Sequence, residues 1–292
     1  MRRIKMMGLC LVAVLAVAAV AVSSASAALP EYKVCAKAAK ETAKYTENGK
    51  EKSKSVYTGA FSDKLCSVAA PAGKYRAGGA PEGKYELESW EAAKKKGFKG
   101  KNGVSTLDSY IPENEATPWT GGTIVGTVSC KSAKSVGELT GPKTSTVTVE
   151  FKTCTSEGKK CSSAGQKAGT IKTALLNTTL GYIEAGVVGS DVEAASKGAS
   201  ASFSCEGLEI VTVGSLIGVN TGNVNKVSKE GTQTFNVNAK GGQEVVFGAF
   251  PESPITGPAH FLISKITPPG VELPSGQKTT SILKGEALEI AA

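Results

Sequence analysis

Alternating apolar and polar residues along most of the chain predict β-strands. Val147, Val149 and Phe151 alternate with polar residues between Thr146 and Lys152. This period of two is typical of a strand with one buried face. The same alternation runs through Ala201–Cys205, and further runs rich in β-branched residues are Thr123–Val128, Thr170–Leu175, Thr178–Ile183, Leu208–Val219, Thr232–Val237, Glu244–Phe250, His260–Ile266 and Thr279–Ile290.

Turn-forming clusters separate these runs. Examples are Thr140-Gly-Pro142, Gly241-Gly242 and Pro268-Pro-Gly270. About ten short strands with frequent turns and no long helix pattern after Gly97 are typical of all-β folds. We therefore predict an antiparallel β-sandwich or barrel, preceded by a less regular lysine-rich segment.

The segment before residue 102 gives a weaker pattern. Cys35–Lys44 has helical propensity, whereas Lys50–Ser55 and Ala69–Gly83 have loop composition. Tyr85–Trp90 is predicted to be a strand or to lead into a short helix over Ser89–Lys96. A loop is predicted at Ile111–Trp119, where Pro112 and Pro118 interrupt the strand pattern.

The chain begins with the features of a secretory signal peptide. A basic start precedes an apolar run from Gly8 to Val22, and Ala25-Ser-Ala27 is a small-residue cleavage site. We predict cleavage after Ala27, an extracellular location and no membrane-spanning segment in the mature chain. The predicted regions are 1–27 as signal peptide, 28–101 as lysine-rich N-terminal region and 102–292 as β region, the last two sharing one core.

Six cysteines remain after the leader, and outside the cytoplasm they are expected to form disulfides. Cys154 and Cys161 flank a hairpin-sized loop and are predicted to pair. Cys35 and Cys66 enclose no other cysteine and form the second predicted pair, which leaves Cys130 with Cys205. A metal site is not indicated, because there is no C-x-x-C spacing and the chain has one histidine.

Charge is unevenly distributed. Residues 28–101 contain 16 basic and 9 acidic residues, whereas residues 102–292 contain 15 lysines and 17 acids. The basic excess favours contact with an anionic cell-wall polymer or another extracellular surface, although lysines also commonly only solvate a surface. The densest basic stretch, and so the candidate polyanion site, is Lys94, Lys95, Lys96, Lys99 and Lys101. Nucleic-acid binding is not indicated, because only one arginine follows the leader and there are no interleaved aromatics on a recognisable module.

Candidate catalytic groups are few. Ser–His–Asp or Cys–His catalysis would require His260, and no G-x-S-x-G motif accompanies it. A glycosidase needs only two carboxyls, for which Glu184, Glu206 and Glu209 are as suitable as any. No cofactor motif is found, and Trp90 and Trp119 are the only tryptophans.

These observations favour a secreted, non-enzymatic binding or structural scaffold. The alternative is an extracellular carbohydrate- or cell-wall-active hydrolase with paired glutamates. Both tryptophans in one groove with two glutamate carboxyls would favour that enzyme.

Several short motifs together resemble a family of secreted proteins from high-GC Gram-positive (actinobacterial) soil bacteria. They are Leu29-Pro-Glu31 with Cys35, Gly83-Lys-Tyr-Glu86, Val128-Ser-Cys-Lys131, Thr140-Gly-Pro-Lys143, the Cys154 and Cys161 spacing, Leu180-Gly-Tyr-Ile183, Gly214-Ser-Leu-Ile-Gly218 and Glu286-Ala-Leu-Glu-Ile290. This chain departs from the family in a longer segment between Cys35 and Cys66 and in an insertion around Ile111–Trp119. The family has no known activity, so the resemblance implies secretion and disulfides only.

Overall fold

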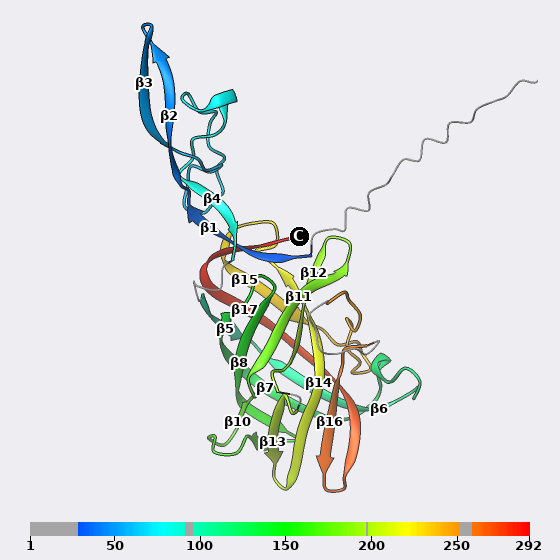
Figure 1. Cartoon of the computed structure of the whole chain (residues 1–292). Coiled ribbons are helices and arrows are strands. Elements are labelled where there is room, and N and C mark those ends of the chain that lie inside the picture. Colours follow the sequence, from blue (N-terminus) through cyan, green and yellow to red (C-terminus); the bar gives the residue numbers. More distant parts are fainter. Residues whose placement is uncertain (1–28, 91–95, 197, 251–258) are drawn as a thin grey trace, which may run out of the picture.

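The computed structural model describes residues 29–90, 96–196, 198–250 and 259–292. These residues form an all-β structure, as the alternating pattern predicts (Figure 1). The strands are β1 (Glu31–Lys37), β2 (Lys40–Glu47), β3 (Lys50–Tyr57), β4 (Tyr85–Ser89), β5 (Gly97–Asn102), β6 (Ser105–Pro112), β7 (Gly122–Leu139), β8 (Thr144–Ser156), β9 (Lys159–Ser162), β10 (Thr170–Lys172), β11 (Leu176–Glu184), β12 (Val187–Ala194), β13 (Ala201–Cys205), β14 (Leu208–Thr221), β15 (Ser228–Phe235), β16 (Leu262–Thr267) and β17 (Val271–Ala291). Two 3₁₀ turns are η1 (Ala77–Gly79) and η2 (Pro118–Thr120). No helix in this part of the chain is long and apolar enough to cross a membrane.

The predicted signal peptide lies outside the described residues, as do residues 91–95 of the predicted helix over Ser89–Lys96. Tyr85–Ser89 forms strand β4, one of the two structures that the sequence allows there. The boundary drawn between residues 101 and 102 falls within β5.

The large antiparallel sheet closes on itself as a barrel. Four long strands, β7, β8, β14 and β17, run along its length, and shorter strands fill the spaces between them (Figure 1). Among the described residues, the upper ring is β5–β7–β8–β11–β12–β14–β15–β17, and β17 pairs back to β5. The lower ring is β6–β7–β8–β9–β13–β14–β16–β17, and β17 pairs back to β6. Closure satisfies the backbone groups that an open sheet would leave at its edges.

Apolar clusters lie toward the two ends of the barrel. The lower cluster contains Val128, Ile171, Phe203 and Ile210 around four cysteines. The upper cluster includes Tyr32, Trp90 and Ile290, where β1 pairs with the end of β17 and crosses the top of the barrel (Figure 1). The middle of the barrel lies between these two clusters.

Many polar side chains of the barrel interior are paired with one another. Asn220 Nδ2 donates to Ser190 Oγ at 2.7 Å, and the hydroxyls of Ser105 and Thr279 lie 2.7 Å apart. Such pairs limit the cost of burying polar groups away from water.

The structure pairs Cys35 with Cys66, as the sequence predicts, but the other two predicted pairs are wrong. The bonds join Cys130 to Cys154 and Cys161 to Cys205. In each bond the two cysteines are directly opposite on neighbouring strands, with Cα atoms 4.0 and 4.2 Å apart. Proximity along the chain favoured Cys154 with Cys161, but register across the sheet decides which side chains face each other.

The lysine-rich N-terminal segment is more regular than its composition indicates. Helical structure for Cys35–Lys44 is wrong, and so is a loop over Lys50–Ser55, because these residues form β1, β2 and β3. β2 and β3 are a two-stranded hairpin that projects away from the barrel (Figure 1). Asn48 and Gly49 form its turn with φ of 52° and 72°, the left-handed values that this residue pair favours in tight hairpins.

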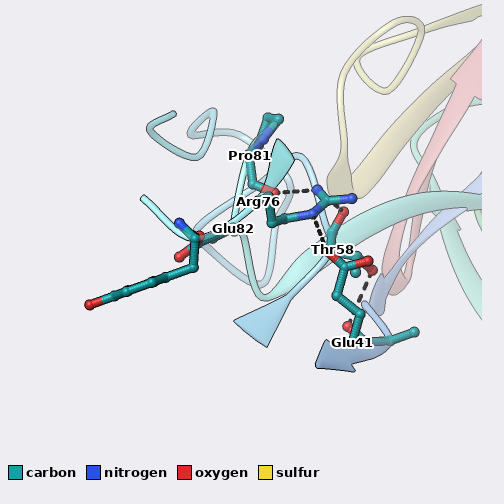
Figure 2. Close-up of polar contacts among 7 residues, drawn as sticks. Glu41, Thr58, Arg76, Pro81 and Glu82 are labelled. Carbon is teal, nitrogen blue, oxygen red and sulfur yellow. Dashed lines mark hydrogen bonds and ion pairs between the residues drawn. The ribbon is translucent and has the colours of Figure 1, made fainter. Parts of the chain in front are cut away.

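Arg76, the one arginine after the predicted leader, ties the base of this hairpin to the following loop (Figure 2). Its Nε donates to Glu41 Oε1 at 2.7 Å. Its Nη1 donates to the carbonyl oxygens of Pro81 at 2.5 Å and Thr58 at 3.2 Å. A guanidinium suits this role because its donors are fixed in a plane and reach three acceptors at once.

One predicted strand, Glu244–Phe250, is wrong. The segment has no regular strand, although Val246 and Phe250 are buried. It lies outside the barrel wall, where Ala249 makes a single bridge to Tyr182 of β11. Its apolar residues therefore cover the outer surface of the sheet instead of joining a ladder.

The observed pairing predicts a specific peptide map. Trypsin cleavage after Lys159 and Lys160 separates Cys154 from Cys161. Without reduction, peptide 153–159 should remain joined to 102–131, and peptide 161–167 to 198–226. A link between 153–159 and 161–167 would contradict the structure.

The Cys161–Cys205 bond should also stabilise the fold. It joins residues 44 positions apart, and closing a loop of that length is worth about 4 kcal/mol in the chain-entropy model. Replacing both cysteines by alanine should lower the free energy of unfolding by roughly 2–4 kcal/mol in denaturant titration.

Candidate functional site

Three of the five lysines of the predicted polyanion site lie within the described residues. Lys94 and Lys95 lie outside the described residues. Lys96 forms an ion pair with Glu286. Lys99 and Lys101 are exposed on β5, and the strands beside β5 bring other lysines to them.

These lysines form a basic face on the outer wall of the barrel. Across β5, β7, β8 and β10, Lys101 lies opposite Lys134, Lys134 opposite Glu150, and Glu150 opposite Lys172. Strands are about 4.8 Å apart, so this row spans about 14 Å. We define the basic face as Lys99, Lys101, Lys134, Lys152 and Lys172.

One carboxylate lies within this face. Lys152 Nζ contacts Glu150 Oε1 at 2.8 Å. The hydrogen bond and charge of Lys152, with the charges of Lys172 and Lys134, hold the pKa of the Glu150 carboxyl below its ordinary value. Three ammonium groups therefore act on one ionised carboxylate, and with Lys99 and Lys101 on β5 the face has five lysines and one acid. Two further acids border this face: Glu138 lies opposite Gly97 at the upper margin, and Glu230 pairs with Lys284, which lies opposite Lys99.

The sequence pattern missed three of these five lysines. Lys134, Lys152 and Lys172 lie in the part of the chain whose overall charge is slightly negative. A partial signal was present, because Glu150 and Lys152 alternate with apolar residues and so had to face outward. The neighbouring strands could not be assigned from the alternation alone.

His260 is part of a buried Ser–His–Asp cluster, but its geometry is not that of a catalytic triad. Ser215 Oγ lies 2.8 Å and Asp191 Oδ1 lies 3.0 Å from the same ring atom, His260 Nδ1. A triad places the carboxylate on Nδ1 and the nucleophile on Nε2, so that one nitrogen is oriented while the other takes the proton. All three residues are buried beneath the outer covering segment. The arrangement therefore serves packing and hydrogen bonding.

Glu193 is a buried carboxyl next to this cluster. Burial, together with the negative charge of Asp191, raises the pKa of Glu193 to about 7, and His260 opposes this shift. A carboxyl in this setting is protonated more readily than in an unfolded chain.

The structure does not bring the groups of the predicted hydrolase together. Glu184 ends β11 at the β11–β12 hairpin, whereas Glu206 and Glu209 lie at the β13–β14 turn. These two hairpins are at opposite ends of the barrel (Figure 1). Trp90 belongs to the upper apolar cluster, and Trp119 packs against Phe247 and Phe261.

Within the residues that the structure describes, no three His, Cys, Asp or Glu side chains are grouped as metal ligands. Comparisons with protein-family models, curated proteins and solved structures find no match to this chain.

The raised pKa of Glu193 predicts a pH-dependent stability. Its native pKa of about 7 lies above the ordinary value, so ionised Glu193 destabilises the fold above pH 7, and this cost disappears as pH falls to about 4.5. Glu193→Gln should therefore raise Tm at pH 8, by on the order of 2–4 °C, and have less effect at pH 5. Thermal unfolding at the two pH values measures the difference. The exposed Glu184→Gln variant is the control, and an equal effect of Glu193→Gln at both pH values would contradict the assignment.

Proposed function

We propose that this protein is a secreted, non-enzymatic scaffold that binds an anionic extracellular polymer, such as a phosphate-containing cell-wall polymer, through its basic face. The observation that carries the proposal is the row of lysines contributed by four adjacent strands. Flexible lysine side chains on a rigid wall suit a polymer of repeated charge, because they need no single fixed geometry.

The predicted extracellular location supports this role. Three disulfides are typical of an oxidising environment, and the N-terminal leader predicts export. The resemblance to secreted actinobacterial proteins points the same way.

The spacing of the basic face also supports a polymeric partner. Its row of about 14 Å, estimated from strand spacing, is longer than one phosphate group, so one small anion would contact only part of it. A linear polymer lying across β5, β7, β8 and β10 could meet all of the ammonium groups. Glu184 is at another hairpin from Glu206 and Glu209, and the two tryptophans belong to different clusters, so the hydrolase alternative has no comparable support.

Long-chain inorganic polyphosphate is a defined probe for this proposal. Binding through about five phosphate contacts should weaken by about 100-fold between 50 and 200 mM salt, because condensed counterions are released. Replacing Lys99, Lys101, Lys134, Lys152 and Lys172 by glutamine should reduce affinity at low salt by at least about tenfold. Fluorescence anisotropy with labelled polyphosphate measures both effects.

The matched control carries the same charge change at scattered surface positions. It replaces Lys64, Lys84, Lys226, Lys240 and Lys265 by glutamine and should retain most of the affinity. Equal losses of affinity in the two variants would mean that net charge, and not the basic face, determines binding, and would contradict the proposal. Undiminished binding by the basic-face variant would overturn the proposal.

A further inference from the structure

The barrel interior contains a cavity of about 190 Å³. Side chains from the wall strands line it, among them Val128, Phe151, Phe203 and Leu216. An apolar protein cavity of about 150 Å³ holds benzene, so this cavity suits a molecule of about eight non-hydrogen atoms. Eight-stranded barrels have an interior of the right width for one small ligand.

Two buried polar atoms in the cavity wall have no hydrogen-bond partner among the described residues. They are Asn102 Oδ1 and Ser135 Oγ. Asn102 is 8% exposed and Ser135 is 4% exposed. The other polar atom of the Asn102 amide is already paired, because Nδ2 donates to Thr279 Oγ1 at 3.2 Å. The third unpartnered atom in the described structure, the Tyr110 hydroxyl, belongs to a residue that does not line the cavity.

The two atoms belong to one patch of the wall. Asn102 of β5 lies opposite Ala133 of β7, and Gly100 lies opposite Ser135, so Asn102 and Ser135 are diagonal neighbours. The Ser135 hydroxyl occupies the space where a side chain at position 100 would lie. A Cβ on Gly100 would be 2.0 Å from Ser135 Oγ, so the hydroxyl can take this position only because residue 100 is glycine. Buried polar groups in native structures normally have partners, so a patch of this kind in a cavity indicates a ligand.

The chemistry of the wall defines the ligand class. The Asn102 amide oxygen only accepts, so the ligand must present a hydroxyl or N–H group, while the Ser135 hydroxyl can donate to or accept from a second polar contact. Charged lining residues are limited to Lys96, Lys229, Lys284 and Glu286 near the top of the barrel. An ionised ligand at the patch would be desolvated without a counter-charge beside it.

We propose that the barrel interior is a binding site for a small, neutral, mostly apolar molecule whose hydroxyl or N–H group donates to Asn102 Oδ1 and contacts Ser135 Oγ. This site is separate from the basic face on the outer wall. The lower end of the cavity is closed by the disulfide-containing cluster. The ligand therefore enters from the upper end, where Lys284 and Glu286 are exposed.

The test uses p-cresol, which has about the required size and a hydroxyl donor, and its methyl ether 4-methylanisole, which cannot donate. Isothermal titration calorimetry with the mature protein should show saturable binding of p-cresol. The ether should bind at least about tenfold more weakly, because it leaves the Asn102 acceptor unpaired. No saturable p-cresol binding, or equal affinity for the two compounds, would overturn the proposal; an ordered water satisfying both atoms would give the first result.

Two variants locate the site. Asn102→Leu should lose the preference for p-cresol over its ether, and Ser135→Ala should weaken p-cresol binding by several-fold. Lys229→Gln, which alters a charged lining residue near the top of the barrel, is the control and should bind as the parent does. If Asn102→Leu does not fold, the Ser135→Ala variant and the ether comparison decide. The basic-face variant should bind p-cresol normally, which distinguishes this site from the polymer surface.

Discussion

The pairing of β17 with both β5 and β6 is the interaction on which the rest of this structure depends. β17 is the longest strand, with 21 residues, and it meets β5 along its upper part and β6 along its lower part. Without these ladders the sheet would be open, with unpaired backbone groups at two edges. Closure converts one face of the sheet into an interior, and so creates both the apolar clusters and the space between them.

Cross-strand register then determines which side chains meet on the outer and on the inner face of the barrel wall. Outside, it aligns Lys101 with Lys134 and Lys134 with Glu150. Inside, the same β5–β7 ladder places Asn102 diagonal to Ser135. Because successive side chains of a strand point to opposite faces, the proposed polymer surface and the proposed ligand patch share the same strands without sharing residues. The two functions are therefore independent in chemistry but depend on the same ladder.

The disulfides and the covering segments reinforce other parts of the barrel. Two bonds join directly opposed strands in the lower cluster, and β1 crosses the upper end. The segment through Val246 and Phe250 covers the outer wall above His260 and Asp191. The Ser–His–Asp cluster lies beneath this cover, which explains why its geometry satisfies buried polar groups and does not resemble a proton relay.

Local sequence determined the class of fold, because an alternation of two and turn residues such as Asn48-Gly49 are properties of a few neighbouring residues. It also identified six cysteines suited to disulfides, and it predicted the Cys35–Cys66 pair. It did not determine the partners of Cys154 and Cys161 or the neighbours of Lys101. Those depend on which strands lie side by side and in what register, and that is set by non-local backbone pairing and barrel closure. The basic face and the interior patch were therefore decided by the tertiary structure alone, since their residues meet only after distant strands have paired.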